Sequence, residues 1–300
     1  MKTKARKQLV IKGRIIMRVG FVSDLHTDFN RKYDFAAILL KLVQDQQLDQ
    51  LVVMGDSANG LTRNLKFDQA LSKVLPVPIR TLVGNHDVYV ANPRQQSVAA
   101  VQEQSRQAYW QLDHLPTSLT RHPIVTPHWI ITGINGWYDY TFAKNFSESL
   151  GPKLATNWVA EHIWPDQMYI NRNQISYRRD RNWVTNQIFA WQHQINQMQI
   201  GSKKILVATH MLPTKRLARQ MPIPGYDRFM YPLGSERYRQ IFEQNHVSVS
   251  ISGHSHMPNQ ISYHGISYQN ISLGYDFQWQ NAGDALGELK RVMFILEDNK

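Results

Sequence analysis

The sequence predicts an α/β fold that ends in β-structure. From Arg18 onward, short apolar runs alternate with stretches of helical periodicity, which is typical of βαβ units with helices on the faces of a sheet. Between Ile261 and Leu296 apolar and polar residues tend to alternate, which indicates antiparallel strands. The chain has 300 residues, of which 42% are hydrophobic, so it can bury a sizeable core. It contains no cysteine, which excludes disulfides and thiolate metal sites.

The expected strands follow one another with room for helices between them. The apolar runs predict strands at residues 18–22, 51–54, 79–83, 129–134, 205–208 and 247–251. Apolar residues at helical spacing fill the first two gaps, at 35–42 and 67–74. Pro76 and Pro78 end the second of these helices, so the third strand begins directly after them.

The segment 136–200 differs in composition from the rest of the chain, because it holds five of the eight tryptophans. We interpret it as an insertion within a single domain that spans 18–300. Its last part repeats apolar residues at spacings of four and three from Val184 to Met198, which predicts an amphipathic helix packed on the sheet as core. The alternative role for that helix is binding of a partner.

A basic tail, residues 1–17, precedes the first expected strand. The formal net charge of +11 suggests an anionic partner, but it falls to +5 without the six lysines and arginines of residues 1–16. Lys12 and Arg14 interrupt the apolar residues of the tail, so it lacks the core of a signal peptide and we expect a cytoplasmic protein. No run approaches the roughly 18 apolar residues of a membrane span. Translation from Met17 is one hypothesis for the tail, and an anion-binding arm is the other.

Polar residues with metal-ligand chemistry follow five of the expected strands. They are Asp24 and His26, then Asp56, then Asn85 with His86 and Asp87, then His210, and finally His254 with His256. In open α/β sheets the carboxyl ends of the strands converge on one ligand crevice, so these residues are expected to meet there. The sequence therefore predicts one metal-binding pocket.

The composition of this set favours transition metals. Imidazole and carboxylate ligands without thiolates suit Mn, Fe, Zn or Co better than Mg or Ca. Seven candidate ligands exceed the needs of one ion, but two ions about 3.5 to 4 Å apart, bridged by one carboxylate, would use them all. Such a pair stabilises the attacking and leaving oxygens of phosphoryl transfer and acidifies a bridging water, so no serine or cysteine nucleophile is required.

Taken in order, these blocks resemble those of the calcineurin-like metallophosphoesterases over roughly Arg18 to Leu273. Each block alone is weakly specific, but five in the family's order, each after a strand, are highly specific. The resemblance implies a four-layer β-sandwich flanked by helices, with the metal centre at one end of the sheets. It also implies that the late β-rich segment belongs to the second sheet.

The resemblance further implies a role for each residue. The first metal would take Asp24, His26, Asp56 and His256, and the second would take Asp56, Asn85, His210 and His254, with Asp56 as the bridge. His86 would contact the scissile phosphate and help to protonate the leaving oxygen. Asp87 would orient His86.

Three further residues are candidates for contact with substrate. Where the family often has Gly-Asp-x-x-Asp, this chain ends the block in Asn59, which keeps the hydrogen bonding and loses the charge. We expect this exchange to alter the properties of the metal site without loss of metal. Trp137 and Tyr138 follow a strand end and open the aromatic segment, so they would stack on or hydrogen-bond to a substrate, with structural packing as the alternative.

We therefore predict a metal-dependent phosphoesterase that hydrolyses phosphate mono- or diesters with a metal-bridging hydroxide as nucleophile. We expect two divalent transition-metal ions per chain, with manganese as the first choice and iron, zinc or cobalt as alternatives. The expected substrate is a phosphorylated small molecule or a nucleotide-like compound. Two alternatives remain. One is a non-catalytic scaffold of the same fold that binds a protein partner. The other is a nucleic-acid processing nuclease, which we do not favour because most of the excess positive charge lies in the tail.

Overall fold

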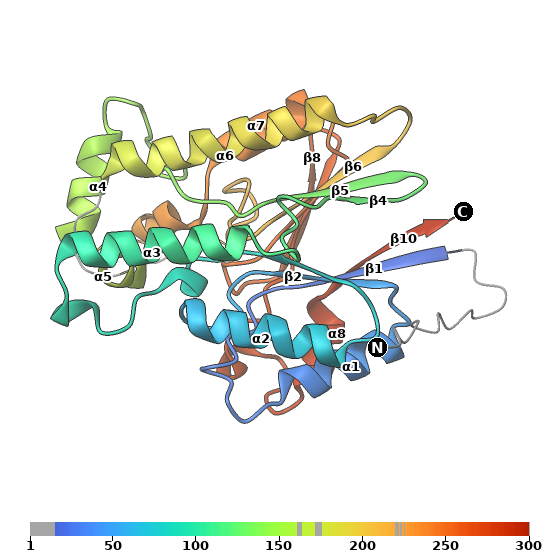
Figure 1. Ribbon diagram of the computed structural model, residues 1–300. Helices are drawn as coiled ribbons and strands as arrows, with labels where there is room; N and C mark the ends of the chain where they lie inside the picture. The colour runs from blue at the N-terminus through green and yellow to red at the C-terminus, as the bar shows by residue number, and fades with distance from the viewer. Residues whose placement is uncertain are drawn as a thin grey trace.

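Two β-sheets lie face to face, with helices on their outer surfaces (Figure 1). The computed structural model describes residues 16–160, 164–171, 176–219, 222, 224 and 226–299. This arrangement confirms the predicted α/β class and the layered sandwich. No helix in the described part of the chain combines the length and apolarity that a bilayer crossing requires.

The first sheet has four strands in the order β10-β1-β2-β3. They are β1 (Ile16–Val22), β2 (Gln50–Met54), β3 (Ile79–Leu82) and β10 (Phe294–Asn299). The first three are parallel, and β10 pairs antiparallel with β1. The outer face is covered by α1 (Phe35–Asp45), α2 (Leu61–Val74) and α8 (Ala285–Val292).

The second sheet has six strands in the order β4-β5-β6-β7-β9-β8. They are β4 (Ile124–Val125), β5 (Trp129–Ile134), β6 (Lys204–Thr209), β7 (Val249–Ser252), β8 (Asn259–Tyr263) and β9 (Ile266–Asn270). The four central strands are parallel, whereas β4 and β8 pair antiparallel at the two edges. Above this sheet lie α6 (Tyr177–Gln197) and α7 (Glu236–Gln244) (Figure 1). The remaining helices are α3 (Val98–Asp113), α4 (Gly151–Ala160) and α5 (Pro165–Tyr169).

The central strands are buried on both faces, so successive side chains enter different layers of the core. Phe21 packs between the two sheets in one cluster with Leu206 of the second sheet. The next residue, Val22, packs against the outer helices with Leu39 of α1. The near-continuous apolar runs that predicted these strands are the consequence of this double burial.

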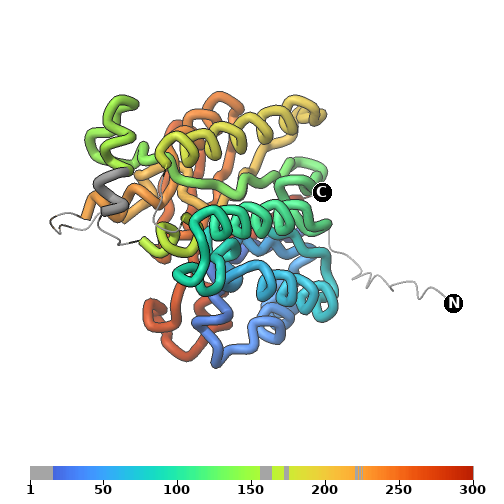
Figure 2. The backbone as a smooth tube through the Cα atoms, turned by 60° about the vertical axis from the view of Figure 1, so that its left-hand side comes forward, coloured from blue at the N-terminus to red at the C-terminus, as the bar shows by residue number. Residues whose placement is uncertain are grey.

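Two expectations for the C-terminal segment are wrong. Residues 285–292 form α8 and not a strand, with Asp284 capping the helix and Ala285, Leu289 and Val292 buried on one face. An eight-residue helix spans little more than two turns, too few for its periodicity to stand out. The following strand, β10, joins the first sheet beside β1 and not the second sheet. In Figure 2 the red C-terminal segment accordingly lies beside the blue N-terminal elements.

The first strand begins inside the expected tail, and helices form in the expected insertion. Ile16 and Met17 belong to β1, so the strand begins two residues earlier than predicted. The rest of the tail, residues 1–15, lies outside the described residues. In the 136–200 segment, α6 has Val184 and Trp191 buried, as expected of a core helix, and the described part before it includes α4 and α5.

The packing of α6 predicts the effect of two substitutions on the same helix. Trp191 is 3% exposed and its ring centroid lies 5.6 Å from that of Phe242 on α7. Trp191→Ala should lower the free energy of unfolding by about 3–5 kcal/mol, because it leaves a cavity between the two helices. Phe189 lies on the same helix and is 73% exposed. Phe189→Ala should therefore change the free energy of unfolding by less than about 0.5 kcal/mol. Urea unfolding measures both, and equal effects would show that α6 does not pack as described.

Candidate metal centre

The seven predicted ligand residues lie in loops at one end of the two sheets. Each loop directly follows a strand: β1, β2 and β3 in the first sheet, and β6 and β7 in the second. The loops are joined by main-chain hydrogen bonds: the amide of Asp24 donates to the carbonyl of Gly55 (3.2 Å), and that of Gly253 donates to the carbonyl of His210 (2.9 Å). The structure therefore brings all seven residues to one place.

Five of these residues have a left-handed backbone conformation that non-glycine residues rarely adopt. The φ angles are 60° at Asp24, 42° at His26, 51° at Asp56, 73° at His254 and 52° at His256. Each such residue costs about 1–3 kcal/mol, and such strain is found mostly at functional sites. Here the strain turns side chains from both sheets toward the same pocket.

The side chains form two groups that have Asp56 between them. Ligand atoms of Asp24, His26 and His256 lie within 4.8 Å of one another, and so do those of Asp56, His210 and His254. Atoms of His26, Asp56 and His86 also lie within this distance of one another, so His86 stands beside the ligands. The Oδ2 atom of Asp56 lies 3.4 Å from Nε2 of His210 and 3.9 Å from Nε2 of His26. One carboxylate oxygen thus faces a histidine of each group.

Hydrogen bonds to the far side of three histidines fix which ring nitrogen is available as a ligand. Nδ1 of His210 donates to the carbonyl of Met54 (2.9 Å), and Nε2 of His254 donates to the carbonyl of Pro232 (3.1 Å). Nδ1 of His256 donates to Oε1 of Gln278 (3.0 Å). Because these acceptors require an N–H, the other nitrogen of each ring is the one left to bind a metal, once it carries no proton.

The electrostatics of the pocket favour a bound cation. Burial acts to raise the pKa of Asp56, but the charges of His210 and His86 outweigh it and hold the pKa well below its usual range. Burial acts to lower the pKa of His210, but the charge and hydrogen bond of Asp56, together with the charge of Asp24, raise it to about 10. Burial and the charge of His210 lower the pKa of His254 to about 3, so this ring is neutral. Ionised Asp56 and neutral His254 are in the forms that bind divalent transition metals, whereas a metal at His210 would displace the proton that this ring holds.

Comparison with known proteins identifies the family to which this arrangement belongs. Residues 17–258 match the family model of the calcineurin-like phosphoesterases. The chain belongs to this family. Its members hydrolyse phosphoric esters with the help of metal ions, and this chain is a metal-dependent phosphoesterase. No curated protein sequence matches the chain.

Solved structures share the fold at low sequence identity. A phosphopantetheinyl hydrolase from Mycobacterium tuberculosis is 16% identical, with a TM-score of 0.67 over 90% of this chain and 94% of that one. A dimetal phosphatase from Danio rerio is 14% identical, with a TM-score of 0.45 over 85% of this chain and 87% of that one. The first likeness supports the fold of this phosphoesterase, and the second is too low to add to it.

The contact expected to orient His86 is made by a different residue. Nδ1 of His86 lies 2.7 Å from Oδ1 of Asn59, to which it donates. Asp87 instead accepts from the main-chain amides of Gly84 (2.7 Å), Asp56 (3.1 Å) and Ser57 (3.0 Å). The predicted Asp87 to His86 contact is therefore wrong: Asp87 holds the loops after β2 and β3 together, and Asn59 takes the orienting position.

Two residues next to the ligands were not predicted from the sequence. Nδ2 of Asn85 donates to Oδ1 of Asp166 (2.8 Å), which also accepts from the hydroxyl of Tyr89 (2.5 Å). Gln278 accepts from His256, as described above. Asp166 lies on the five-residue helix α5 and Gln278 in a 3₁₀ turn, and neither belongs to a motif, so no local signal marks them.

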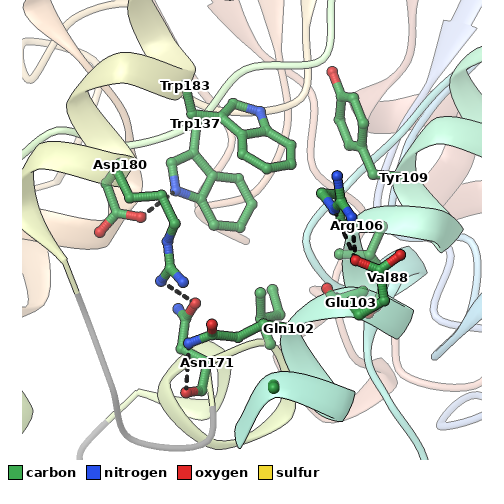
Figure 3. A pocket seen from close by; sticks show the side chains of 13 residues that line it. Val88, Gln102, Glu103, Arg106, Tyr109, Trp137, Asn171, Asp180 and Trp183 are labelled. Atoms are coloured by element: carbon green, nitrogen blue, oxygen red, sulfur yellow. Dashed lines mark hydrogen bonds and ion pairs between the residues drawn. The ribbon is translucent and has the colours of Figure 1, made fainter.

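The contacts of Trp137 and Tyr138 favour the packing alternative over contact with substrate. Tyr138 is completely buried and Trp137 is 6% exposed. Their rings stack at 4.8 Å, and Nε1 of Trp137 donates to Oδ1 of Asp180 (3.2 Å). Trp137 and Asp180 form one wall of a cavity of about 300 Å³, which none of the seven ligand residues lines (Figure 3).

The buried carboxyl group of Asp180 makes the free energy of unfolding depend on pH. Burial raises the pKa of Asp180 to about 6, above its ordinary value of 3.8. The folded state therefore binds the proton more tightly than the unfolded state, so the free energy of unfolding falls as the pH rises from about 4 to about 6. The contribution lost is about 3 kcal/mol. Urea unfolding at intervals between pH 4 and pH 7 should show this fall relative to Asp180→Asn, and a constant difference between the two proteins would contradict it.

Proposed function

We propose that this phosphoesterase holds two divalent ions and that Asp56 bridges them. The observation that carries the proposal is the position of Asp56 Oδ2, which faces His26 of one ligand group and His210 of the other. Asp24, His26 and His256 would complete the first site, and Asn85, His210 and His254 the second. When bound, such ions supply positive charge to phosphoryl oxygens and lower the pKa of water.

The donor set supports transition metals. Each site would combine imidazole nitrogens with carboxylate or amide oxygens, which suits manganese, iron, zinc or cobalt. We propose manganese as the metal to test first. The hydrogen bond from Asn85 to Asp166 would hold the side-chain amide of Asn85 in one orientation. In that orientation Oδ1 of Asn85 faces His210 and lies 3.2 Å from its Nε2 atom.

His86 is the proposed general acid for the leaving oxygen. Its ring is partly exposed and lies 4.7 Å, between ring centroids, from His26. Because Nδ1 of His86 is hydrogen-bonded to Asn59, Nε2 is the nitrogen that would give a proton to the departing alcohol. The main-chain amide of His86 also donates to Oδ1 of Asp56 (2.9 Å), which ties the acid to the proposed bridge.

The substrate is proposed to be a phosphate mono- or diester of a small molecule or a nucleotide-like compound. The phosphopantetheinyl group named for the M. tuberculosis structure is one substrate to test. The nuclease alternative has only the charge of residues 1–16 to support it, and the scaffold alternative is opposed by the complete ligand set. The cytoplasmic location stays a prediction.

Metal analysis together with hydrolysis tests the dinuclear proposal. Protein purified without chelator and given manganese should contain about two metal ions per chain and hydrolyse nitrophenyl phosphate mono- or diesters. Asp56→Asn should lose metal from both sites, and its rate should fall by more than the roughly 100-fold that loss of an outer partner of a metal ligand costs. Full metal content and full rate in this variant would refute the bridging role. Absence of metal from the wild-type protein would favour the scaffold.

His86 and Asn59 should affect turnover without affecting metal content. His86→Ala should lower kcat by about 100-fold to 10,000-fold, because the leaving oxygen departs unprotonated. Asn59→Ala should lower kcat by about 10- to 100-fold, because His86 loses its orienting acceptor. Elemental analysis of both variants provides the control. If metal is lost in parallel with kcat, His86 is a ligand and not an acid.

A further inference from the structure

Three aromatic side chains stand at the solvent edge of the metal centre. Phe29 follows the first ligand loop and is 56% exposed, and Phe277 in the loop after β9 is 78% exposed. Tyr275 lies between them, with ring centroids 5.0 Å from Phe29 and 5.5 Å from Phe277. We refer to Phe29, Tyr275 and Phe277 as the aromatic rim. Singly scattered exposed apolar residues are ordinary, whereas contiguous exposed apolar patches are typical of ligand- or partner-binding surfaces.

The rim contacts the proposed reaction centre directly. The ring of Tyr275 lies 4.8 Å from that of His26 and 4.7 Å from that of His256, between centroids. The ring of Phe29 lies 6.1 Å from His26 and 6.4 Å from His86. A molecule bound at His86 would therefore lie within reach of Phe29.

The rim is held in place by a buried asparagine. Asn30 is 2% exposed, and its Nδ2 donates to the carbonyls of Leu25 (2.9 Å) and Gly274 (3.1 Å). Its Oδ1 accepts from the amide of Asp276 (3.0 Å). These bonds join the loop that carries Phe29 to the loop that carries Tyr275, so the rings are positioned before any ligand arrives.

The charges around the rim do not suit a phosphate group. Lys32, close to Phe29 in sequence, is paired with the carboxylate of Asp276 (2.6 Å), which compensates its charge. The phosphoryl group of an ester belongs instead at the histidine and carboxylate ligands. The part of a bound ester that would face the rim is therefore its alcohol.

We propose that the aromatic rim binds a planar aromatic group in the alcohol part of the phosphate ester. This inference rests on the proposed function and names the substrate class of the same site. The leaving oxygen starts beside His86, and the alcohol extends from it across Phe29 toward Tyr275. A planar ring stacks on such side chains without any particular hydrogen-bonding pattern, so an aryl group or a nucleobase fits equally.

A set of esters with alcohols of similar acidity tests the proposal. Benzyl, cyclohexylmethyl and ethyl phosphate, each as the monoester and as the methyl diester, are compared as substrates of the manganese-loaded protein. The expected kcat/KM is about tenfold higher for the benzyl ester than for either of the others, since one stacked ring contributes roughly that factor. The cyclohexylmethyl ester separates stacking of a planar ring from burial of an apolar group of similar size.

Variants locate the preference on the rim. Phe29→Leu and Phe277→Ala should each bring the ratio of benzyl to cyclohexylmethyl kcat/KM closer to one. Phe189→Ala removes an equally exposed phenylalanine from α6 and should leave that ratio unchanged. Because Phe29 and Phe277 are both largely exposed, unfolding curves of these variants should match the wild type and exclude misfolding as the cause.

The outcomes separate this inference from the function on which it rests. Hydrolysis of none of the esters, by protein that has bound metal, would overturn the proposed function and the inference with it. Hydrolysis of all of them with equal benzyl and cyclohexylmethyl kcat/KM would overturn the inference alone. A benzyl preference that survives both rim substitutions would also overturn it, because the ring would then bind elsewhere.

Discussion

Asp56 is the residue on which the arrangement of the site depends, because several loops bind its polar groups. Its carbonyl accepts from the amide of His26, and its Oδ1 accepts from the amide of His86. Its Oδ2 faces His210, which follows a strand of the other sheet, at 3.4 Å. So close an approach requires glycine at position 84, where a Cβ atom would lie 2.2 Å from Asp56 Oδ1. One buried carboxylate thus sets the spacing between the loops of both sheets.

The burial of charge around Asp56 explains why the pocket favours a cation. An ionised carboxylate removed from water costs several kcal/mol unless opposite charge and hydrogen bonds compensate it. The raised pKa of His210 expresses this balance, since positive charge between Asp24 and Asp56 lowers the free energy of the folded state. Divalent ions would satisfy the same balance more fully than a proton. Metal binding would then stabilise the fold as well as the strained backbone of the ligand residues.

The residues suited to metal binding and those suited to substrate choice lie on different parts of the chain. The ligand residues directly follow strands, where the rigid sheets set their positions. Phe29 lies farther out in the loop after β1, and Tyr275 and Phe277 lie in the loop after β9, which carries no ligand residue. Loops change in sequence at less cost than strands do. If the aromatic rim selects the alcohol as proposed, a change in these outer residues would alter the choice of ester and leave the ligand residues in place.

The sequence by itself determined the chemistry of this protein, because each polar block follows an apolar run and the ends of parallel strands converge. Short elements could not be predicted from the sequence, since the eight residues of α8 show too little periodicity to distinguish helix from strand. Trp137 occupies the same kind of position as the ligands and yet packs against Tyr138 and Asp180, which contacts with a distant segment decide. Asn59 and His86 are 27 positions apart, and Asn85 and Asp166 are 81 apart. Only the tertiary structure decided which side chains orient others and which face solvent, because those contacts join segments that no local pattern connects.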